Sequence, residues 1–531
     1  MSTRKIFLPH PHNYTNDKDN ILDYAETLMN FCKKYSKLAD AHIVDFFIKN
    51  TWEEVIPEEW TDAFKVEYMS ESENGITEEG EEKKFMNKMI RLASFCEYEE
   101  DWPESLKQFI RNTKGLVLMR DISINDLQIE CEESIDKRIL PGMNEKKLHE
   151  VRILSCLIAK LTKENKISSI IDLGAGQGYL SRVLAYTYNL CVFAVDASNI
   201  QTCGAQKYQF RTEKSLGLLR KGKKEVDDKS NELISEKKGG LTHVTQHVTT
   251  ETLTNLISEW NKNKEQFNVG EVGDYEFNKV VNDNKNIVDG SCSAKHLKQD
   301  NNFLICGLHS CGELSSTMLD LFIKNEEIKC VVNVGCCYHL LHENENSKQE
   351  NSKDEDIKCS FPLSKFFKEK NFYMGLTIRH LACQVPSRWS VQQESSIKAF
   401  EHHFFRALLQ YILIKKDLVK DTPRIGKLHH RSFTSFSTYC NAALKKLSLP
   451  LNSITQSESE KYYNEFKQKG YMRKIIVFWT LRAMLGPCFE SIILLDKCLY
   501  LFENNHVKEV KCFGIFDELK SPRNMVIVGI K

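Results

Sequence analysis

Residues 168–180 (SSIIDLGAGQGYL) constrain the fold of this chain more than any other stretch. They begin with an apolar run that ends at Asp172, which is the pattern of a buried strand, and they end in a helical pattern. Between the two patterns stand Gly174, Gly176 and Gly178. Glycine allows the backbone to turn sharply and to approach a ligand where a side chain would exclude it. The stretch therefore predicts a strand, a tight ligand-binding turn and a helix.

The spacing after this turn separates two kinds of nucleotide-type cofactor. A second strand-like run, residues 190–195, ends at Asp196, 20 positions after Gly176, where an acidic side chain is placed to hydrogen-bond ribose hydroxyls. The dinucleotide fingerprint requires its third glycine at position 179, which is a tyrosine here. The pattern Asp-x-Gly-x-Gly-x-Gly is instead that of S-adenosylmethionine-dependent methyltransferases, whose ligand lacks a pyrophosphate. We therefore expect S-adenosyl-L-methionine as the cofactor, with a ligand-free structural turn and a nicotinamide or flavin site as the alternatives. The predicted cofactor-binding residues are Asp172, Gly174, Ala175, Gly176, Gly178, Asp196 and Ala197.

Charge and cysteine content limit the partners and the compartment. Lys plus Arg and Asp plus Glu both number 73 in 531 residues, so the net charge favours neither nucleic acid nor a membrane, and an RNA substrate needs a local basic patch. The 18 cysteines are scattered and the first residues do not resemble a signal peptide, which predicts free thiols in an intracellular compartment, cytoplasmic or nuclear. The apolar stretch at 475–502 contains Arg482, Glu490, Asp496 and Lys497, so we expect a buried helix and no membrane span.

Alternating strand-like and helix-like segments predict an α/β fold. Further strand patterns occur at 243–248, 302–308 and 328–334, with helical patterns between them, as in a doubly wound parallel sheet. Two more apolar runs, at 507–516 and 525–530, are joined by a short loop and predict a hairpin. This terminal hairpin would complete a seven-stranded, Rossmann-like methyltransferase sheet.

Composition divides the chain into four predicted parts. These are a helical N-terminal region at 1–140 with a mobile tail at 1–18, a methyltransferase core at 141–345, an inserted and mostly helical lobe at 346–480, and a last helix with the C-terminal β-hairpin at 481–531. Polar segments near 221–240, 262–300 and 344–358 contain few large apolar residues. We expect them to be surface insertions that are available to a protein partner.

Polar clusters follow four of the predicted strands. They are the glycine turn, Asp196, residues 309–312 and residues 335–339, and the carboxyl ends of parallel strands would bring them to one edge of the sheet. Methyl transfer from a sulfonium needs an aligned nucleophile, and a nitrogen or oxygen acceptor can also need a general base. Histidine titrates near neutrality and tyrosine can orient an acceptor. The predicted catalytic residues are therefore His309, Tyr338 and His339, with packing as the alternative role.

Cysteine and histidine side chains near the same edge raise the question of a metal site. Such soft ligands suit zinc or an iron–sulfur cluster. The candidates are His309, Cys311, Cys336, Cys337, His339, His342, His380 and Cys383. They include no Cys-x-x-Cys pair, and Cys336 and Cys337 would point to opposite faces of an extended backbone. We therefore predict no metal.

Two other segments are candidates for the rim of the site. The sequence QVPSRW combines a rigid proline, a cation and an indole, so Arg388 and Trp389 are the predicted substrate-binding residues, one for phosphate and one for stacking on a base. The alternative is a buried tryptophan with the arginine on its face. Lys146, Lys147 and Glu150 precede the glycine turn and would either line its mouth or form a solvated helix start.

The order of the motifs resembles one methyltransferase family. The motifs are IDLGAGQG, VDA, GLHSCGEL, GCCYH and SPRN. They are similar to those of methyltransferase-like protein 25 and of its sister, the ribosomal RNA adenine dimethylase domain-containing protein. This resemblance implies a class I methyltransferase fold and S-adenosyl-L-methionine. Residues 307–312 and 335–339 are also similar to the eukaryotic tRNA 2′-O-methyltransferases that act on the acceptor stem. The Asn/Asp-Pro-Pro-Tyr motif of amino-methyltransferases does not occur, so N6-adenine methylation is not expected.

These features together predict an S-adenosylmethionine-dependent methyltransferase that acts on RNA or protein. RNA is favoured by the similarity to tRNA enzymes and by the Arg-Trp segment, whereas the zero net charge argues against it. The alternative is a degenerate methyltransferase fold that serves as an interaction scaffold. The intact glycines and the acidic residues at 172 and 196 argue against the loss of cofactor binding.

Overall fold

The computed structural model describes eight segments of the chain, and every structural statement below concerns these segments. They are residues 4–11, 17–66, 78–120, 134–218, 240–263, 302–343, 359–423 and 425–531. Their contacts divide the chain into two compact units. The sheet unit consists of Met1–Ile21, Leu118–Tyr373 and Ile493–Lys531, and the helical unit consists of Leu22–Val117 and Met374–Ile492. This division differs from the predicted four parts, because the N-terminal helices and most of the predicted lobe belong to one unit.

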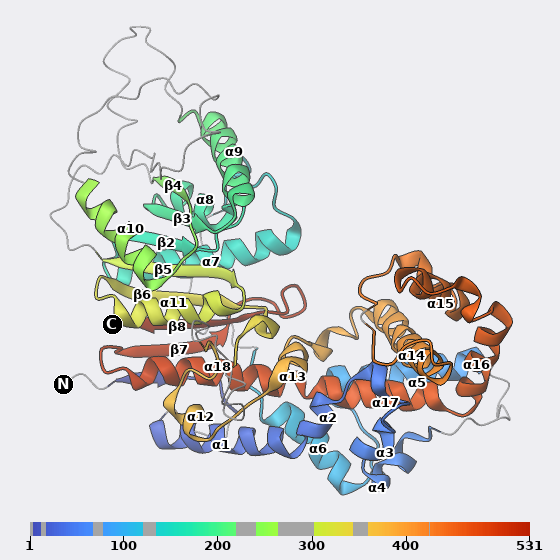
Figure 1. Cartoon of the computed structure of the whole chain (residues 1–531). Coiled ribbons are helices and arrows are strands. Elements are labelled where there is room, and N and C mark those ends of the chain that lie inside the picture. The colour runs from blue at the N-terminus through green and yellow to red at the C-terminus, as the bar shows by residue number, and fades with distance from the viewer. Residues whose placement is uncertain are drawn as a thin grey trace. The chain divides into compact units, whose positions relative to one another are not determined.

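A sheet of eight strands forms the centre of the sheet unit (Figure 1). The strands are β1 (Lys5–Phe7), β2 (Ser169–Leu173), β3 (Val192–Asp196), β4 (Leu241–Thr245), β5 (Phe303–Ser310), β6 (Ile328–Gly335), β7 (Glu509–Gly514) and β8 (Met525–Ile530). Their order across the sheet is β1-β7-β8-β6-β5-β2-β3-β4. All neighbours pair in parallel except β8, which is antiparallel to both β6 and β7. The predicted α/β class and the terminal hairpin are confirmed.

The sheet has one strand more than the seven that the sequence predicts. The additional strand is β1, which pairs in parallel with β7 at the edge of the sheet and lies within the segment predicted to be a mobile tail. Ile6 and Leu8 hold this segment in place, since both side chains are buried. A strand of three residues is too short to show a periodic pattern, so the sequence did not reveal it.

The helices of the sheet unit pack against strands that are buried on both faces. All five residues of β2 are buried, which explains why the parallel strands read as continuous apolar runs. One hydrophobic core joins α7 and α8 to the central strands and to the terminal hairpin. The helices of this unit are α7 (Glu145–Glu164), α8 (Tyr179–Tyr186), α9 (Asn199–Leu216), α10 (Thr250–Asn263), α11 (Glu313–Lys324) and α12 (Lys365–Glu369), with the short 3-10 helix η5 (Tyr338–Leu340) after β6.

The helical unit contains the second group of helices. Its N-terminal part has α1 (Lys18–Lys34), α2 (Ser36–Asp40), η1 (Ile43–Asp45), α3 (Thr51–Val55), α4 (Glu58–Thr61), η2 (Asp62–Phe64), α5 (Glu78–Phe95) and α6 (Glu104–Gly115). Its later part has α13 (Gly375–Leu381), η7 (Pro386–Arg388), α14 (Gln393–Lys415), η8 (His430–Phe433), α15 (Phe436–Lys446), η9 (Leu451–Ser453), α16 (Gln456–Gln468) and α17 (Tyr471–Met484). The first residues of α18 (Gly486–Glu503) also belong to this unit, and from Ile493 on the helix belongs to the sheet unit. Contacts between the two parts, such as those of α5 with α14 and α17, make one unit from segments that are far apart in sequence.

The most apolar stretch of the chain forms α17 and α18. By length and composition alone, the segment Tyr471–Glu503 is one that a membrane could accommodate, and among the described residues it is the one candidate. In the structure, however, 89% of its most apolar window is buried within the protein, as in a core helix. The predicted insertions at 221–240, 262–300 and 344–358 lie almost entirely outside the described residues.

Candidate active site

The four predicted polar clusters lie at one edge of the sheet. β3, β2, β5 and β6 are consecutive, parallel neighbours, so the segments that follow their carboxyl ends are adjacent. The glycine turn follows β2, Asp196 ends β3, and residues 309–312 and 335–339 end or follow β5 and β6. The expectation that these clusters share an edge is confirmed. This edge is where ligands bind in open α/β sheets.

The turn after β2 adopts the backbone conformation that requires glycine. Gly174, Gly176 and Gly178 have φ angles of +72°, +55° and +66°, in the left-handed region that side chains disfavour. The amides of Gly174 and Ala175 donate to the carbonyl of Val195 at 2.9 and 3.2 Å, which fixes the turn against the end of β3. The turn is therefore held by the backbone of the neighbouring strand.

The three glycines differ in what surrounds them. A Cβ at Gly174 would lie 2.9 Å from Leu314 Cδ2, and one at Gly178 would lie 2.8 Å from His243 Cε1, so both positions are closed by packing. A Cβ at Gly176 would meet no atom within 4 Å. Gly176 thus presents bare backbone to open space, which is the arrangement that a closely bound ligand needs.

Asp196 faces this open position. Its Oδ2 accepts a hydrogen bond from the Gly176 amide at 2.9 Å, and its Oδ1 accepts one from the Ser198 amide at 2.8 Å. Each carboxylate oxygen has a further lone pair for a ribose hydroxyl. Ala175 is half-buried and Ala197 is exposed beside these groups. The residues present therefore fit the adenosine and methionine parts of S-adenosyl-L-methionine.

Asp172 supports the turn from below. Its side chain is 2% exposed and its Oδ2 accepts a hydrogen bond from Ser181 Oγ at 2.5 Å, which joins the end of β2 to the first turn of α8. Burial raises the pKa of Asp172 to about 6, with a smaller contribution from the negative charge of Asp196, although the hydrogen bond from Ser181 opposes the rise. Asp172 was predicted to contact the cofactor, and the structure shows it bonded within the protein.

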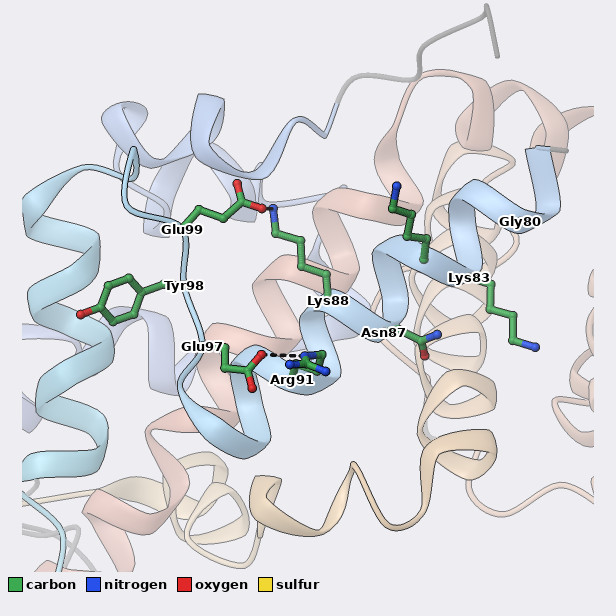
Figure 2. A pocket seen from close by; sticks show the side chains of 9 residues that line it. Gly80, Lys83, Asn87, Lys88, Arg91, Glu97, Tyr98 and Glu99 are labelled. Atoms are coloured by element: carbon green, nitrogen blue, oxygen red, sulfur yellow. Dashed lines mark hydrogen bonds and ion pairs between the residues drawn. The ribbon is translucent and has the colours of Figure 1, made fainter. Parts of the chain in front are cut away.

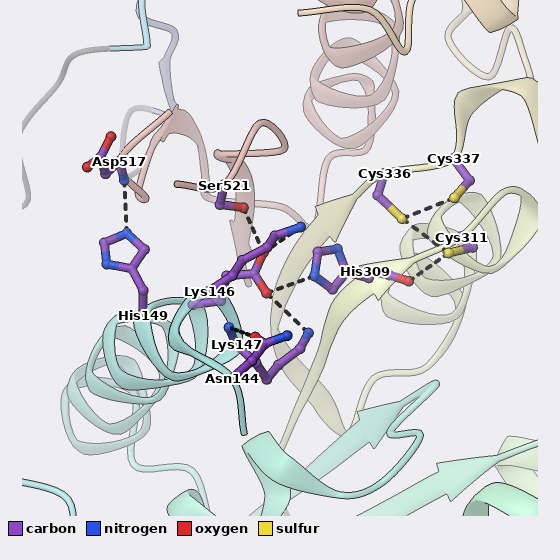
Figure 3. A network of polar contacts seen from close by, with 11 residues as sticks. Asn144, Lys146, Lys147, His149, His309, Cys311, Cys336, Cys337, Asp517 and Ser521 are labelled. Carbon is purple, nitrogen blue, oxygen red and sulfur yellow. Dashed lines mark hydrogen bonds and ion pairs between the residues drawn. The ribbon is translucent and has the colours of Figure 1, made fainter. Parts of the chain in front are cut away.

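His309 projects from a bulge at the end of β5. The register of β5 on β6 shifts between Leu308 and Ser310, and His309 is the additional residue, with a φ of +67°. Its Nε2 lies 2.9 Å from Oε2 of Glu150, a residue of α7 (Figure 3). The bulge therefore turns one of the predicted catalytic side chains toward a carboxylate.

Glu150 is the centre of a polar network around His309. Its Oε1 accepts a hydrogen bond from Ser521 Oγ at 2.7 Å, and the ammonium of Lys147 lies 3.1 Å from its Oε2 (Figure 3). Burial opposes ionisation of Glu150, but the contacts with His309, Ser521 and Lys147 outweigh it and lower the pKa to about 2. An ionised carboxylate only accepts hydrogen bonds, so His309 Nε2 carries the proton and a neutral ring has its lone pair on Nδ1. This arrangement suits a general base.

The other two predicted catalytic residues lie on η5. Tyr338 is 2% exposed, and the guanidinium of Arg523 lies 5.4 Å from the centroid of its ring. A buried ring beneath a cation serves packing. His339 is half-buried on the same short helix. The catalytic roles of Tyr338 and His339 stay predictions, whereas the ring of His309 contacts a carboxylate.

The structure brings three thiols together at this edge. Cys311 Sγ lies 3.1 Å from Cys336 Sγ, which lies 3.4 Å from Cys337 Sγ (Figure 3). The argument that adjacent Cys336 and Cys337 point to opposite faces is wrong, because the backbone bends at Cys337 (φ −101°, ψ 71°) to begin η5. In the described part of the chain, no cysteine forms a disulfide bond.

The predicted substrate-binding residues belong to the helical unit. Arg388 ends η7, and the indole of Trp389 packs edge-to-face on Phe400 with 5.6 Å between ring centroids. Ser94 of α5 fixes this segment, since its Oγ donates to the Pro386 carbonyl at 3.0 Å. Trp389 thus takes part in the packing of its unit but is only half-buried, and the role of Arg388 and Trp389 in substrate binding stays a prediction.

A pocket of about 540 Å³ on α5 contains none of the predicted site residues (Figure 2). Its wall includes the cations Lys88 and Arg91, which pair with Glu99 at 2.7 Å and with Glu97 at 2.6 Å. Lys83 and Lys84 also line the pocket, so its wall carries four cations and two carboxylates, a net charge of +2.

Glu150 and Ser521 belong to the site but were not among the predicted site residues. They come from α7 and from the loop before β8, 371 residues apart. The sequence allowed two positions for Glu150, at the mouth of the glycine turn or at a solvated helix start. Glu150 is fully buried, so it does not lie at a solvated helix start. No local pattern signals a carboxylate whose partners come from distant segments.

Comparisons with known proteins agree with this geometry. A family model described as a methyltransferase domain matches residues 146–344, which include the glycine turn, Asp196 and the segments after β5 and β6. The chain is 26% identical to the probable methyltransferase-like protein 25 of Mus musculus, over 97% of this chain and 98% of that protein. It is also 26% identical to the Homo sapiens protein of the same name, over 98% and 99%. No solved structure matches the chain. These matches support a methyltransferase and confirm the predicted resemblance: the chain is similar to methyltransferase-like protein 25 over nearly its whole length and carries a methyltransferase domain.

Proposed function

We propose that this chain is an S-adenosyl-L-methionine-dependent methyltransferase that acts on an RNA. The observation that carries the cofactor assignment is the turn after β2, where Gly176 faces open space and its amide is bonded to Asp196. When bound, the cofactor supplies an electrophilic methyl group on a sulfonium. The chain's own contribution is to hold the adenosine and methionine parts at the turn and to present an acceptor at the adjacent edge.

His309 is the proposed general base for a nitrogen or oxygen acceptor. Glu150 fixes its ring through Nε2, and Ser521 and Lys147 fix Glu150 in turn. Nδ1 is then the ring atom that takes a proton from the acceptor. We propose an RNA acceptor because residues 307–312 and 335–339 are similar to tRNA 2′-O-methyltransferases, in which a hydroxyl is methylated.

Calorimetry of the full-length protein with S-adenosyl-L-methionine tests the cofactor assignment. We expect saturable binding that Asp196→Ala weakens by tenfold or more, about 1.4 kcal/mol. Glu251→Ala, which removes an exposed carboxylate from α10 of the same unit, is the matched control and should bind as the wild type does. Absence of binding to folded wild-type protein would refute the proposal and favour the interaction scaffold.

A transfer assay then tests the acceptor class. The protein is incubated with methyl-labelled S-adenosyl-L-methionine and an extract from cells that lack it, and the label is followed through ribonuclease and protease digestion. Loss of the label with ribonuclease supports RNA, and loss with protease replaces RNA by a protein acceptor. Glu150→Gln should reduce the rate while cofactor binding is retained, since the proposed base loses its partner.

A further inference from the structure

The thiols of Cys311, Cys336 and Cys337 converge from the ends of two adjacent parallel strands. Cys311 follows β5, and the other two follow β6. All three sulfur atoms lie within 4.8 Å of one another, and two of the distances are 3.1 and 3.4 Å. Zinc bound at about 2.3 Å by tetrahedral thiolates separates its sulfurs by about 3.8 Å. The two observed distances are a few tenths of an ångström shorter than this value, so small side-chain rotations would seat one ion.

The backbone is built to keep the two segments together. Gly312, directly after Cys311, has a φ of +54°, and a Cβ there would lie 2.6 Å from the Cβ of Leu340 at the end of η5. Only glycine allows this close approach. The bend at Cys337 that begins η5 then turns its thiol toward Cys336. The backbone of both loops therefore keeps the three cysteines adjacent.

The charge and exposure around the thiols suit a bound cation with an open position. Three thiolates and one divalent ion carry a net charge of −1. Lys497 is 1% exposed, and its ammonium donates to Ser315 Oγ and lies 3.7 Å from where a Cβ of Gly335, the residue before Cys336, would be. A buried cation therefore lies near the segment that carries two of the thiols. Cys311 is exposed, and the other two cysteines are half-buried. The side of Cys311 is therefore open for a fourth ligand.

We propose that Cys311, Cys336 and Cys337 form a three-thiolate site for one Zn²⁺ ion, with a fourth coordination position open to water or to a substrate atom. Three protein ligands and an open position are the arrangement of catalytic zinc sites, whereas iron–sulfur clusters are usually held by four cysteines. A disulfide would use only two of the three thiols and would need an oxidant. Binding releases the thiol protons to solvent, so the site takes up the ion as three thiolates.

Metal analysis of the full-length protein tests this proposal. Protein purified without chelators is analysed for zinc by mass spectrometry, and the metal-free protein is titrated with Zn²⁺ alone and with Co²⁺, whose absorption reports thiolate ligation. We expect about one zinc per chain and thiolate-to-cobalt absorption bands. Each of Cys311→Ser, Cys336→Ser and Cys337→Ser should lower the zinc affinity by tenfold or more.

Two cysteines of the same unit provide matched controls. Cys359 is half-buried and its thiol donates to the Phe361 carbonyl at 3.1 Å, whereas Cys203 is exposed on α9. Cys359→Ser and Cys203→Ser should keep the wild-type zinc content. The proposal is overturned if folded wild-type protein shows no zinc binding and no cobalt–thiolate bands, if the three variants bind zinc as the wild type does, or if peptide mapping of anaerobically purified protein finds a disulfide between Cys311 and Cys336. Zinc is measured without S-adenosyl-L-methionine, so these outcomes are independent of the proposed function.

Discussion

Replacing Gly176 by alanine is the sharpest test of how the glycine turn works. The φ of +55° costs an alanine about 1–2 kcal/mol of strain, but the new methyl group meets no atom of the protein within 4 Å. The variant should therefore fold, with a loss of stability that is due to the backbone strain alone. The methyl group would occupy the space assigned to the cofactor, so we expect the affinity for S-adenosyl-L-methionine to fall by tenfold or more, about 1.4 kcal/mol.

Gly217 offers a control with the same backbone strain and a different location. It ends α9 with a φ of +72°, and a Cβ there also meets nothing within 4 Å. Gly217→Ala should therefore lose as much stability as Gly176→Ala but bind the cofactor as the wild type does. Thermal melting measures the first quantity and calorimetry the second.

Alanine at either of the two flanking glycines, Gly174 and Gly178, should lower stability more than alanine at Gly176 does. An alanine at Gly174 or Gly178 would overlap Leu314 or His243, at 2.9 and 2.8 Å, which adds about 1–3 kcal/mol of overpacking to the strain. These variants should be less stable than Gly176→Ala. If Gly176→Ala binds S-adenosyl-L-methionine with wild-type affinity, or if Gly217→Ala loses binding equally, the reasoning about the turn is refuted.

Three further predictions concern buried carboxylates of the sheet unit. Glu150→Gln should lower the free energy of unfolding by about 3 kcal/mol near pH 7, because a pKa of about 2 in the native state, against 4.5 in the unfolded state, stabilises the wild type above pH 5. This stabilisation is lost as the pH falls toward 2, so the urea midpoints of the two proteins should converge in acid. A constant difference between the midpoints would contradict this linkage. Asp172→Asn should have the opposite pH dependence, because the pKa is about 6 in the native state and 3.8 in the unfolded state. The wild type therefore has about 3 kcal/mol of stability below pH 4 that is lost as the pH rises through 6. The melting temperature of the variant should rise relative to that of the wild type between pH 4 and 8, and a constant difference would disprove this. Asp496→Ala should lower the free energy of unfolding by about 3–5 kcal/mol, because the fully buried carboxylate accepts hydrogen bonds from the amides of Leu363 and Ser364 at 2.8 and 2.9 Å. If the variant melts at the temperature of the wild type, these bonds contribute little to stability.

The sequence predicted the parts of the fold that local patterns encode. The parallel strands β2, β3, β5 and β6 are long apolar runs that end in polar residues, so their existence and the edge they share followed from the chain order. The strand β4 begins two residues before the predicted run at 243–248 and ends three residues before its end, at Thr245. The strand β1 was not predicted because three residues are too few to show an alternating hydrophobic pattern.

The site was predictable where the residues that form it are close in sequence. The glycine turn and Asp196 are separated by 20 residues and a known spacing, and they meet as expected. Glu150 contacts His309 and Ser521, which are 159 and 371 residues away in the sequence. No pattern along the chain predicts these two contacts. Burial of a charged residue is decided by what covers it, which only the assembled fold contains.

The thiol cluster shows which step of the sequence argument failed. Neighbouring parallel strands already place the segment of Cys311 beside that of Cys336, so the topology alone predicts that these two residues meet. What failed was the assumption that the backbone stays extended through Cys337, since alternation of side chains holds only within a strand. β6 ends at Gly335, so the alternation ends before the two cysteines begin. A pair of adjacent ligands that follows a strand end should therefore be judged by turn geometry, and by that criterion the three cysteines form a ligand set that the search for Cys-x-x-Cys spacing would always miss.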